Sequence, residues 1–499
     1  MSLRPAQRAP VVWTIAGSDP SGGGGVQADL KTITALGGHG CSIVTSLTAQ
    51  NTIEFLDLQP VPPAHLMAEF EALNYDLPPS AIKIGLLANR EIIEFVVNSI
   101  HSLRAQHTNV SVTLDPIVAA TSGRRFLNEA DLNFIGDSLL PLIDILTPNL
   151  PEAERLTGFR LDSTEDIQRA GAQLLQMGAK CVIIKGGHAK TMFSQDFFCT
   201  ATEKVWLSSP RLADCNVRGT GCTFASALAT ARAFGFSQLD AAVIAKTYLN
   251  QCLRSRRSLS QHGGAELLGG GSWPADTTDL PWLTRLAHEA RRQFSDCGPE
   301  RLGFYPIVNR ASWLKRLLPL GVRTIQLRIK DLKGEALDNE IREAVTIANY
   351  HKCRLFINDF WQLALKHSAY GVHLGQEDLE EADLDAISRK GLRLGVSTHS
   401  YAELARARAV QPSYIALGPI FPTQIKAMRF GPQGLHTLSV WRKLVGTTPL
   451  VAIGGISFNA AKELLAYGPD SLAVVSDITQ HPTPEVRALA WLSVFENTA

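Results

Sequence analysis

Short apolar runs of strand length alternate with longer stretches of helical period through the first half of the chain. The runs lie at Val11–Ala16, Ser42–Leu47, Ala81–Leu86, Val112–Leu114, Ile143–Leu146 and Cys181–Ile184. Apolar strands separated by amphipathic helices are typical of a parallel sheet that is covered on both faces. The pattern therefore predicts an α/β sandwich with a mostly parallel sheet.

The pattern stops after a helix that ends near Arg257. Residues 261–279 hold several glycines and show little periodicity, and a helical stretch is predicted at 280–294. Glycine-rich segments of this kind are typical of linkers. We therefore predict a first domain at 1–262, a linker region at 263–300 and a second domain at 301–499. The triple glycine at 269–271 could also be a functional loop of the first domain.

A second rhythm, of eight strand-like runs with helical stretches between most of them, fills the rest of the chain. The runs are Gly303–Val308, Thr324–Ile329, Arg354–Ile357, Gly371–Leu374, Arg393–Ser397, Tyr414–Leu417, Leu450–Ile453 and Ser471–Val475. Eight strand–helix units in about 200 residues are the size of a closed (β/α)₈ barrel. The second domain is therefore predicted to be a TIM barrel.

Composition narrows the function. The chain has 48 basic and 47 acidic residues, which gives no support to a nucleic-acid or membrane-surface partner. Its eight cysteines form no CxxC pair and no zinc-like spacing with histidine, and no apolar stretch approaches the length that spans a bilayer. We expect a cytoplasmic protein with reduced thiols and small-molecule substrates, and a homodimer is left open.

The stretch Val217–Thr223 has the features of an anion site. Gly219 and Gly221 allow a tight turn, and the helix behind them presents free N–H groups and the positive end of its dipole. The same field is expected to lower the pKa of Cys222, so that this thiol can accept a proton from a substrate hydroxyl. The alternative is a glycine turn before a core helix with a buried cysteine, because short glycine motifs are weak evidence.

Polar residues follow the strand ends of the first domain, where open α/β sheets bind ligands. Any one of them could be a turn residue or a helix cap, but together they predict a shared site. They are Asp19, Gln50, Asn51, Asp115, Asn149, Glu152 and Lys185.

The barrel mouth is predicted to hold a diphosphate. Arg328 and Lys330 lie two apart on one strand, so both side chains point into the mouth. Asp359 and Asp378 follow the third and fourth strands, and their carboxylates suit Mg²⁺, which normally recruits substrate phosphates. The cations and the metal would together stabilise a departing diphosphate.

A second anionic pocket is predicted beside the first. Gly454-Gly455 and Val475-Ser476 follow the last two strands, where barrels bind a phosphate through backbone N–H groups. The two pockets suit a reaction in which diphosphate leaves one substrate and a phosphate-tethered second substrate attacks the same carbon. His373 is expected to fill the core. The alternative is a set of structural ion pairs and turn glycines.

The first domain resembles the hydroxymethylpyrimidine and phosphomethylpyrimidine kinases of thiamine biosynthesis, members of the ribokinase-like superfamily. The shared motifs are AGSDPSGG at 16–23, QADLK at 27–31, TAQNT at 48–52, TPNLPEA at 147–153, KGGH at 185–188 and GTGCT at 219–223. The resemblance implies two ATP-dependent phosphorylations, first of 4-amino-5-hydroxymethyl-2-methylpyrimidine and then of its monophosphate.

The resemblance also implies roles for single residues. These are substrate binding by Asp29 and Gln50, Mg-ATP binding by Asp115 and Glu152, nucleotide binding by Asn149, Gly219, Thr220 and Gly221, and catalysis by Lys185 and Cys222. Cys222 stands where many relatives carry an aspartate base. Arg218 stands where the family usually has histidine.

The second domain resembles thiamine-phosphate synthases. The shared motifs are QLRIK at 326–330, FIND at 356–359, GVHLGQED at 371–378, GVSTH at 395–399, GPIFPTQIK at 418–426, IGGI at 453–456 and VVS at 474–476. The resemblance implies that hydroxymethylpyrimidine diphosphate is coupled to a thiazole phosphate, giving thiamine phosphate and diphosphate.

The roles implied in the barrel fall into three groups. Mg²⁺ is assigned to Asp359 and Asp378, with Arg328 and Lys330 catalytic. Substrate binding is assigned to Gln326, Leu327, Arg328, Ile329, Lys330, Asn358, Ser397, Thr423, Gln424, Ile425, Lys426, Gly454, Gly455, Val475 and Ser476. Ile425 departs from the family, which usually has a threonine there, so weaker thiazole binding is expected.

The sequence therefore predicts a bifunctional enzyme of thiamine biosynthesis that uses ATP and Mg²⁺. Two alternatives stay open. In the first, the kinase acts on another vitamer, such as pyridoxine, and the barrel has an unrelated use. In the second, the barrel binds its ligand without turning it over.

Overall fold

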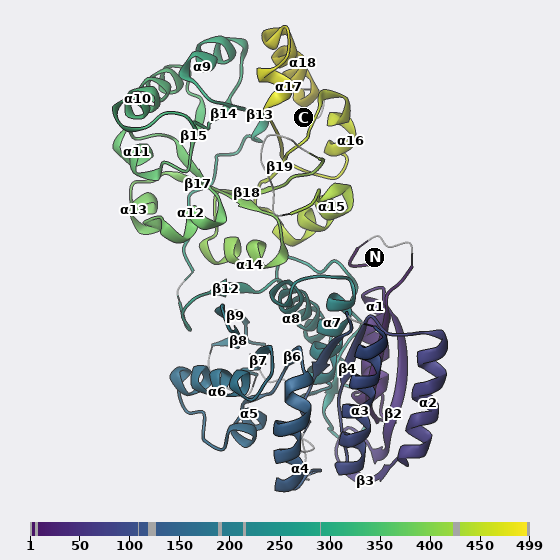
Figure 1. The fold of residues 1–499 in the computed structure, drawn as a ribbon. Coiled ribbons are helices and arrows are strands. Elements are labelled where there is room, and N and C mark those ends of the chain that lie inside the picture. The colour runs from purple at the N-terminus through teal and green to yellow at the C-terminus, as the bar shows by residue number, and fades with distance from the viewer. Residues whose placement is uncertain are drawn as a thin grey trace. The chain divides into compact units, whose positions relative to one another are not determined.

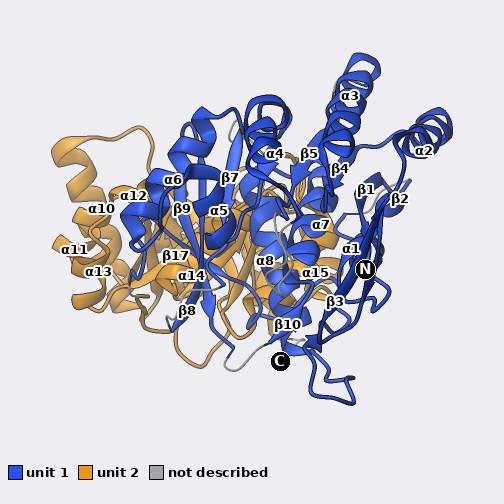
Figure 2. Ribbon diagram, turned by 90° about the horizontal axis from the view of Figure 1, so that it is seen from below, with its two compact units in different colours: residues 1–289 blue, residues 290–499 orange. Residues whose placement is uncertain are grey.

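The fold is taken from a computed structural model that describes residues 2–4, 8–107, 109–117, 126–187, 192–212, 216–289, 291–422 and 430–496. The chain forms two compact units, residues 1–289 and 290–499, which Figure 2 colours separately. We describe each unit by itself.

Unit 1 is built on a ten-stranded sheet in the order β12-β9-β8-β7-β6-β5-β4-β1-β2-β3. The strands are β1 (Val11–Ser18), β2 (His39–Gln50), β3 (Phe55–Pro60), β4 (Ala81–Ile84), β5 (Ser111–Leu114), β6 (Ile145–Leu146), β7 (Cys181–Ile184), β8 (Phe193–Thr200), β9 (Lys204–Pro210) and β12 (Trp282–Thr284). The six strands from β7 to β2 are mutually parallel, as predicted, and antiparallel strands extend the sheet at both ends.

Helices cover both faces of this sheet (Figure 1). They are α1 (Gly25–Ala35), α2 (Pro63–Asp76), α3 (Arg90–Gln106), α4 (Glu129–Phe134), η1 (Ile135–Leu139), η2 (Leu140–Leu142), α5 (Leu150–Thr157), α6 (Thr164–Gln176), α7 (Thr220–Ala233) and α8 (Gln238–Arg254). Strand alternation separates the two layers. In β1, Trp13 packs in the cluster that holds Phe70 of α2, whereas Val12 packs with Ala229 of α7.

The segment predicted as a linker is largely part of unit 1. Strand β11 (Glu266–Leu267) pairs with β10 (Val217–Arg218), and β12 pairs with β9. The helix predicted at 280–294 is wrong, because Trp282–Thr284 is a strand at the edge of the sheet and residues 285–289 and 291–294 form no helix. All three residues of β12 are buried, so the apolar spacing reflects burial and not helical period.

Unit 2 is a closed barrel of eight parallel strands, which confirms the predicted (β/α)₈ architecture. The strands are β13 (Gly303–Val308), β14 (Thr324–Leu327), β15 (Arg354–Asn358), β16 (Gly371–Leu374), β17 (Arg393–Thr398), β18 (Tyr414–Leu417), β19 (Leu450–Ile453) and β20 (Ser471–Val474). Strand β13 pairs with β14 and with β20, which closes the barrel.

Helices follow the strands around the barrel (Figure 1). They are α9 (Ala311–Leu317), η3 (Leu318–Leu320), α10 (Gly334–Tyr350), α11 (Trp361–Lys366), α12 (Gln376–Glu381), α13 (Leu384–Arg389), α14 (Tyr401–Val410), α15 (Gly434–Val445), η4 (Phe458–Ala460), α16 (Ala461–Leu465), α17 (Ser476–Thr479) and α18 (Pro484–Glu496). No helix in the described parts of the chain has the length and hydropathy needed to cross a bilayer.

Candidate active sites

The predicted anion loop of unit 1 depends on two glycines. Gly219 is the N-cap of α7 with φ of 82°, and a Cβ atom there would lie 1.8 Å from the carbonyl oxygen of Gly23. A Cβ atom on Gly221 would lie 3.0 Å from Oδ2 of Asp115 and 3.3 Å from Nζ of Lys185. Gly219 therefore lets the N-cap of α7 lie against the Gly23 backbone, and Gly221 lets the first turn of α7, with Thr220 and its free N–H groups, approach the two charged side chains closely.

Asp115, Lys185 and Glu152 form one charged cluster at the strand ends. Lys185 Nζ donates to Asp115 Oδ1 over 2.7 Å. Burial lowers the pKa of Lys185, but Asp115 and Glu152 outweigh this effect and raise it, so the ammonium stays charged. Burial raises the pKa of Glu152 to about 7, with Lys185 opposing the rise and Asp115 adding to it. A cation beside the two carboxylates would relieve that repulsion, so the cluster fits Mg²⁺.

Asn149 has a structural task that the sequence left as an alternative. It is the N-cap of α5, where its Oδ1 accepts from the N–H of Glu152 over 2.8 Å. In return, Glu152 Oε2 accepts from the N–H of Asn149 over 2.7 Å. This capping box holds the Glu152 carboxylate in place beside Asp115 and Lys185.

The expectation of a lowered pKa at Cys222 is wrong. Cys222 lies in the first turn of α7, but only 7 % of its surface is exposed. Burial raises the pKa of the thiol to about 11, although the nearby Lys83 ammonium opposes the rise. Desolvation of the thiolate outweighs the helix dipole, so the thiol is protonated near neutral pH.

Asp29 lies beneath the site and is fully buried. Its Oδ2 accepts from Lys83 Nζ over 2.8 Å and from Thr14 Oγ1 over 2.6 Å. Its Oδ1 accepts from Ser226 Oγ of α7 over 2.7 Å. The carboxylate is enclosed by these three donors, so its direct contact with a substrate stays a prediction.

Sequence reasoning missed Lys83, the partner of Asp29. Its signal was present, because a single lysine interrupts the apolar run Ala81–Leu86. The ammonium is fully buried, and Asp29, Cys222 and Asp115 together raise its pKa against the opposing effect of burial. Lys83 is therefore a permanent positive charge under the anion loop.

The barrel mouth brings together Arg328, Lys330, Asn358 and Asp359, which the strand-end pattern predicted, and Gln326, which the family resemblance implied. Gln326 and Asn358 are both buried, and Gln326 Nε2 donates to Asn358 Oδ1 over 3.2 Å. Lys330 Nζ lies 2.5 Å from Asp359 Oδ2. Arg328 is half-buried and has no side-chain hydrogen bond or ion pair to any described residue. Its charge is therefore available for an anion.

Asp359 and Asp378 form a pair of carboxylates. Asp359 has φ of 65°, an unusual conformation for a residue other than glycine, and one often kept at functional sites. Burial raises the pKa of Asp378, and a hydrogen bond and the negative charge of Asp359 raise it further. Two neighbouring carboxylates that raise each other's cost of ionisation are a fit for a divalent cation. No group of three or more His, Cys, Asp or Glu able to hold a metal occurs among the described residues.

The other predicted substrate-binding residues of the barrel differ in their exposure, and some of them lie outside the described residues. Leu327 and Ile329 are each 1 % exposed, so only their backbone could contact a substrate. Ser397 is half-buried, and its Oγ lies 2.8 Å from His373 Nε2. Thr423, Gln424, Ile425 and Lys426 lie outside the described residues.

The predicted phosphate nest is built from two adjacent strand ends. Gly454 and Gly455 have φ of 95° and 68°, and a Cβ on Gly455 would lie 2.6 Å from the carbonyl oxygen of Pro422. Directly after β20, Val475 is the N-cap of the short helix α17 and Ser476 is its first residue. Strands β19 and β20 are paired, so the four backbone N–H groups come to the same edge of the mouth.

His373 belongs to a buried polar chain inside the barrel. Its Nε2 faces Ser397 Oγ at 2.8 Å, and its Nδ1 faces Tyr414 Oη at 2.7 Å. Tyr414 Oη lies 2.9 Å from Tyr305 Oη. Burial lowers the pKa of His373 to about 4, with the Arg328 charge adding to the effect. The imidazole is therefore neutral at pH 7, and it fixes the Ser397 hydroxyl at the mouth.

This low pKa predicts a pH-dependent stability of unit 2. The ordinary pKa of 6.5 falls to about 4 on folding, so between these values the unfolded chain binds a proton that the barrel does not. The free energy of unfolding should lose about 2.5 kcal/mol from this group between pH 7.5 and pH 4.5. Urea titrations at both pH values, with unfolding monitored through hydrogen exchange of the amides in β15–β17, would measure the loss. His373→Gln should show a smaller loss, and an equal loss in both proteins would contradict the assignment.

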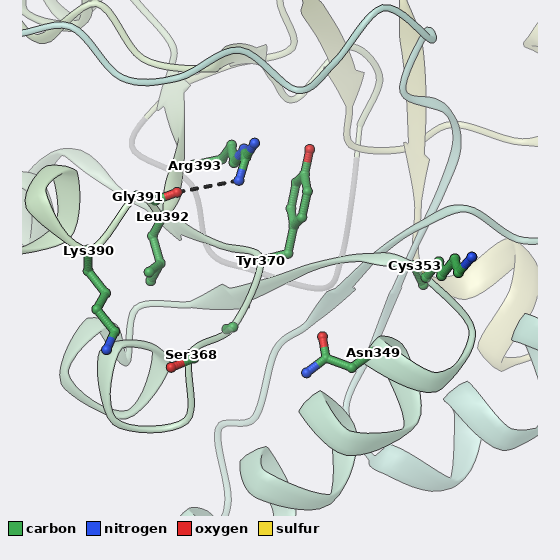
Figure 3. A pocket seen from close by; sticks show the side chains of 10 residues that line it. Asn349, Cys353, Ser368, Tyr370, Lys390, Gly391, Leu392 and Arg393 are labelled. Atoms are coloured by element: carbon green, nitrogen blue, oxygen red, sulfur yellow. Dashed lines mark hydrogen bonds between the residues drawn. The ribbon is translucent and has the colours of Figure 1, made fainter.

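A polar pocket of about 380 Å³ lies at the other end of the barrel (Figure 3). Its lining comes from the turns that precede β15, β16 and β17, including Lys352, Tyr370 and Lys390. Arg393 donates to Gly391 O over 3.4 Å and to Asp296 O over 3.2 Å, and lies 4.8 Å from the Tyr370 ring centroid. None of the predicted site residues lines this pocket. It lies at the amino-terminal ends of the strands, where the residues of (β/α)₈ barrels contribute to stability and not to the active site.

Comparison with known proteins assigns both units. The family model for phosphomethylpyrimidine kinase matches residues 19–266. A solved structure of pyridoxal kinase from Staphylococcus aureus in complex with ADP is 28% identical, covers 56% of this chain and 100% of its own, and has a TM-score of 0.51. A phosphomethylpyrimidine kinase from Clostridium difficile is 33% identical over 48% of this chain and 97% of its own, with a TM-score of 0.42.

The barrel matches a second family. The family model for thiamine monophosphate synthase matches residues 305–478. A thiamine-phosphate synthase from Cronobacter sakazakii is 57% identical over 184 residues, which is 37% of this chain and 88% of that protein. One from Serratia proteamaculans is 58% identical over 186 residues. The chain therefore belongs to the phosphomethylpyrimidine kinase family in its first unit and to the thiamine-phosphate synthase family in its second, which makes it a bifunctional enzyme of thiamine biosynthesis.

Proposed function

We propose that unit 1 phosphorylates 4-amino-5-hydroxymethyl-2-methylpyrimidine and then its monophosphate, with ATP as donor. The observation that carries this proposal is the approach of the α7 N-terminus to Lys185 and Asp115, which Gly221 permits. The free N–H groups of α7 would hold the transferred phosphate, and Lys185 would offset its charge. The ADP complex of the staphylococcal kinase supports ATP as donor.

Asp115 and Glu152 are the residues that would hold Mg²⁺ in unit 1. When bound, the ion would screen the charge that develops on the transferred phosphate. Lys185 contacts Asp115 from one side, and Asn149 fixes Glu152 from the other. Since the Cys222 thiol is protonated, its proposed catalytic role is to orient the substrate hydroxyl by hydrogen bonding.

For unit 2 we propose coupling of the pyrimidine diphosphate to a thiazole phosphate. Arg328 would stabilise the negative charge on the diphosphate as its bond to the pyrimidine methylene carbon breaks. The thiazole nitrogen forms the new bond to that carbon, while Gly454, Gly455 and Ser476 hold its phosphate. Asp359 and Asp378 are the residues that would hold Mg²⁺, and the ion when bound would supply positive charge to the leaving diphosphate. The buried thiols of the described cysteines support a cytoplasmic enzyme.

One incubation tests both activities. The full chain is mixed with hydroxymethylpyrimidine, Mg-ATP and thiazole phosphate, and every product is followed with time. We expect thiamine phosphate and diphosphate, preceded by pyrimidine diphosphate. Pyrimidine diphosphate that accumulates without thiamine phosphate would contradict catalysis by unit 2. Phosphorylation of pyridoxal but not of the pyrimidine would favour the alternative vitamer kinase, which the similarity to pyridoxal kinase makes the relevant competitor.

A further inference from the structure

Arg218 occupies a built position beside the predicted pyrimidine site. It ends the short strand β10 directly before Gly219, and its backbone pairs with Leu267 of β11. Its guanidinium donates to Gln50 Oε1 and to the carbonyl oxygen of Asn51. The side chain is 20% exposed, so it is largely enclosed by these contacts.

The contact with Arg218 fixes which way the Gln50 carboxamide faces. A guanidinium has only donors, so the group that faces it must be the amide oxygen. The amide nitrogen, Nε2, then donates to Thr48 Oγ1 over 2.9 Å, and the Thr48 hydroxyl donates to Ser18 O over 2.7 Å. In a flipped amide, Nε2 would face the donors of Arg218, and Oε1 could accept from the Thr48 hydroxyl only if that hydroxyl gave up its bond to Ser18 O.

Asp19 attracts the Arg218 guanidinium without accepting a hydrogen bond from it. Its Oδ1 accepts from the N–H and the hydroxyl of Ser21, at 2.9 and 2.7 Å. Its Oδ2 is buried, has no hydrogen-bond partner among the described residues, and lies 3.9 Å from Arg218 Nη2. The carboxylate therefore attracts the charge at a distance, and the donors of Arg218 stay with Gln50 and Asn51.

The fixed amide offers a defined edge to a ligand. One hydrogen on Nε2 and one lone pair on Oε1 have no partner among the described residues. A donor and an acceptor side by side match a ring nitrogen that is flanked by an amino group, as in a 4-aminopyrimidine. A pyridine ring without that amino group can satisfy only one of the two. The unmatched group costs binding free energy.

We propose that Arg218 is a positioning residue that makes unit 1 select an aminopyrimidine over a pyridine, because it holds the Gln50 carboxamide in one orientation. The inference rests on the proposed function of unit 1. It adds a determinant of specificity that lies outside the charged cluster around Asp115. The proposal also explains why an arginine suits position 218, because its guanidinium can only donate to the Gln50 amide oxygen.

The test compares two ligands in variants of the full chain. Arg218→Met keeps the unbranched apolar stem of the side chain and removes its donors, and Arg218→Lys keeps one point donor. Hydroxymethylpyrimidine is assayed as substrate and pyridoxal as competitor, so pyridoxal binding is measured even where it is not phosphorylated. For Arg218→Met we expect KM for the pyrimidine to rise about tenfold, with kcat and the inhibition constant of pyridoxal nearly unchanged. Arg218→Lys should recover part of the loss.

A second variant acts at the other end of the same amide. Thr48→Val removes the hydroxyl that accepts from Gln50 Nε2, and it should also reduce the preference for the pyrimidine over pyridoxal. With two independent variants, a folding defect in one of them does not decide the question. Coupling by unit 2 on supplied pyrimidine diphosphate serves as the internal control. An equal change for both ligands, or an unchanged preference in both variants, would overturn the proposal. A wild-type chain that does not phosphorylate the pyrimidine would instead overturn the proposed function.

Discussion

Arg328→Ala is expected to lower kcat/KM for coupling about a thousandfold and to leave both phosphorylations at the wild-type rate. Arg328 is half-buried at the barrel mouth and has no partner among the described residues, so its charge is free to meet the diphosphate. Lys330 differs, because it is exposed and already paired with Asp359 at 2.5 Å. Losing Arg328 therefore removes a donor that contacts the charge developing on the leaving group.

The measurement is thiamine phosphate formed from supplied pyrimidine diphosphate and thiazole phosphate. Arg323→Ala is the matched control, since Arg323 directly precedes β14, is exposed, and lies at the opposite end of the strand from Arg328. It should couple at the wild-type rate. Phosphorylation in the same preparation reports whether the chain is intact. A loss of both activities in Arg328→Ala would contradict the assignment of separate sites.

The barrel and the parallel part of the sheet could be predicted because their signals are local. Each parallel strand is a short apolar run, and the polar residue that follows it marks the edge where the strands end. Arg328 and Lys330 are an example, since their two-residue spacing on one strand was enough to predict that both lie at the barrel mouth. The antiparallel strands β3, β8, β9 and β12 carried no such signal, and β3 is largely exposed.

The rest of unit 1 depends on contacts between distant segments. The segment around Leu267 was predicted as a linker because its glycines are a local feature, whereas its pairing with Arg218 is not visible in the sequence pattern. The error at Cys222 has the same origin. Helix position predicts a lowered pKa, but the burial that raises it to about 11 comes from packing around α7.

Lys83→Met is expected to lower the free energy of unfolding of unit 1 by about 3–5 kcal/mol. The Lys83 ammonium and the Asp29 carboxylate are both fully buried and lie 2.8 Å apart, so the single substitution leaves a buried charge without its counterion. Thr14 and Ser226 still donate to Asp29, but hydroxyl groups do not replace a full positive charge. Urea unfolding of the full chain, followed by hydrogen exchange in β1 and β4, would measure the loss.

Two further variants separate the buried charge from packing. Lys83→Met with Asp29→Asn removes both charges and keeps an acceptor for one of the two hydroxyls, while the other hydroxyl can accept from the amide NH₂, so most of the lost stability should return. Lys180→Met breaks an exposed pair with Asp144, which keeps Arg104 as a partner, and should cost about 0–1 kcal/mol. If the double variant were no more stable than Lys83→Met, the loss would come from packing. Recovery would instead show that the loss in Lys83→Met comes from the uncompensated charge on Asp29.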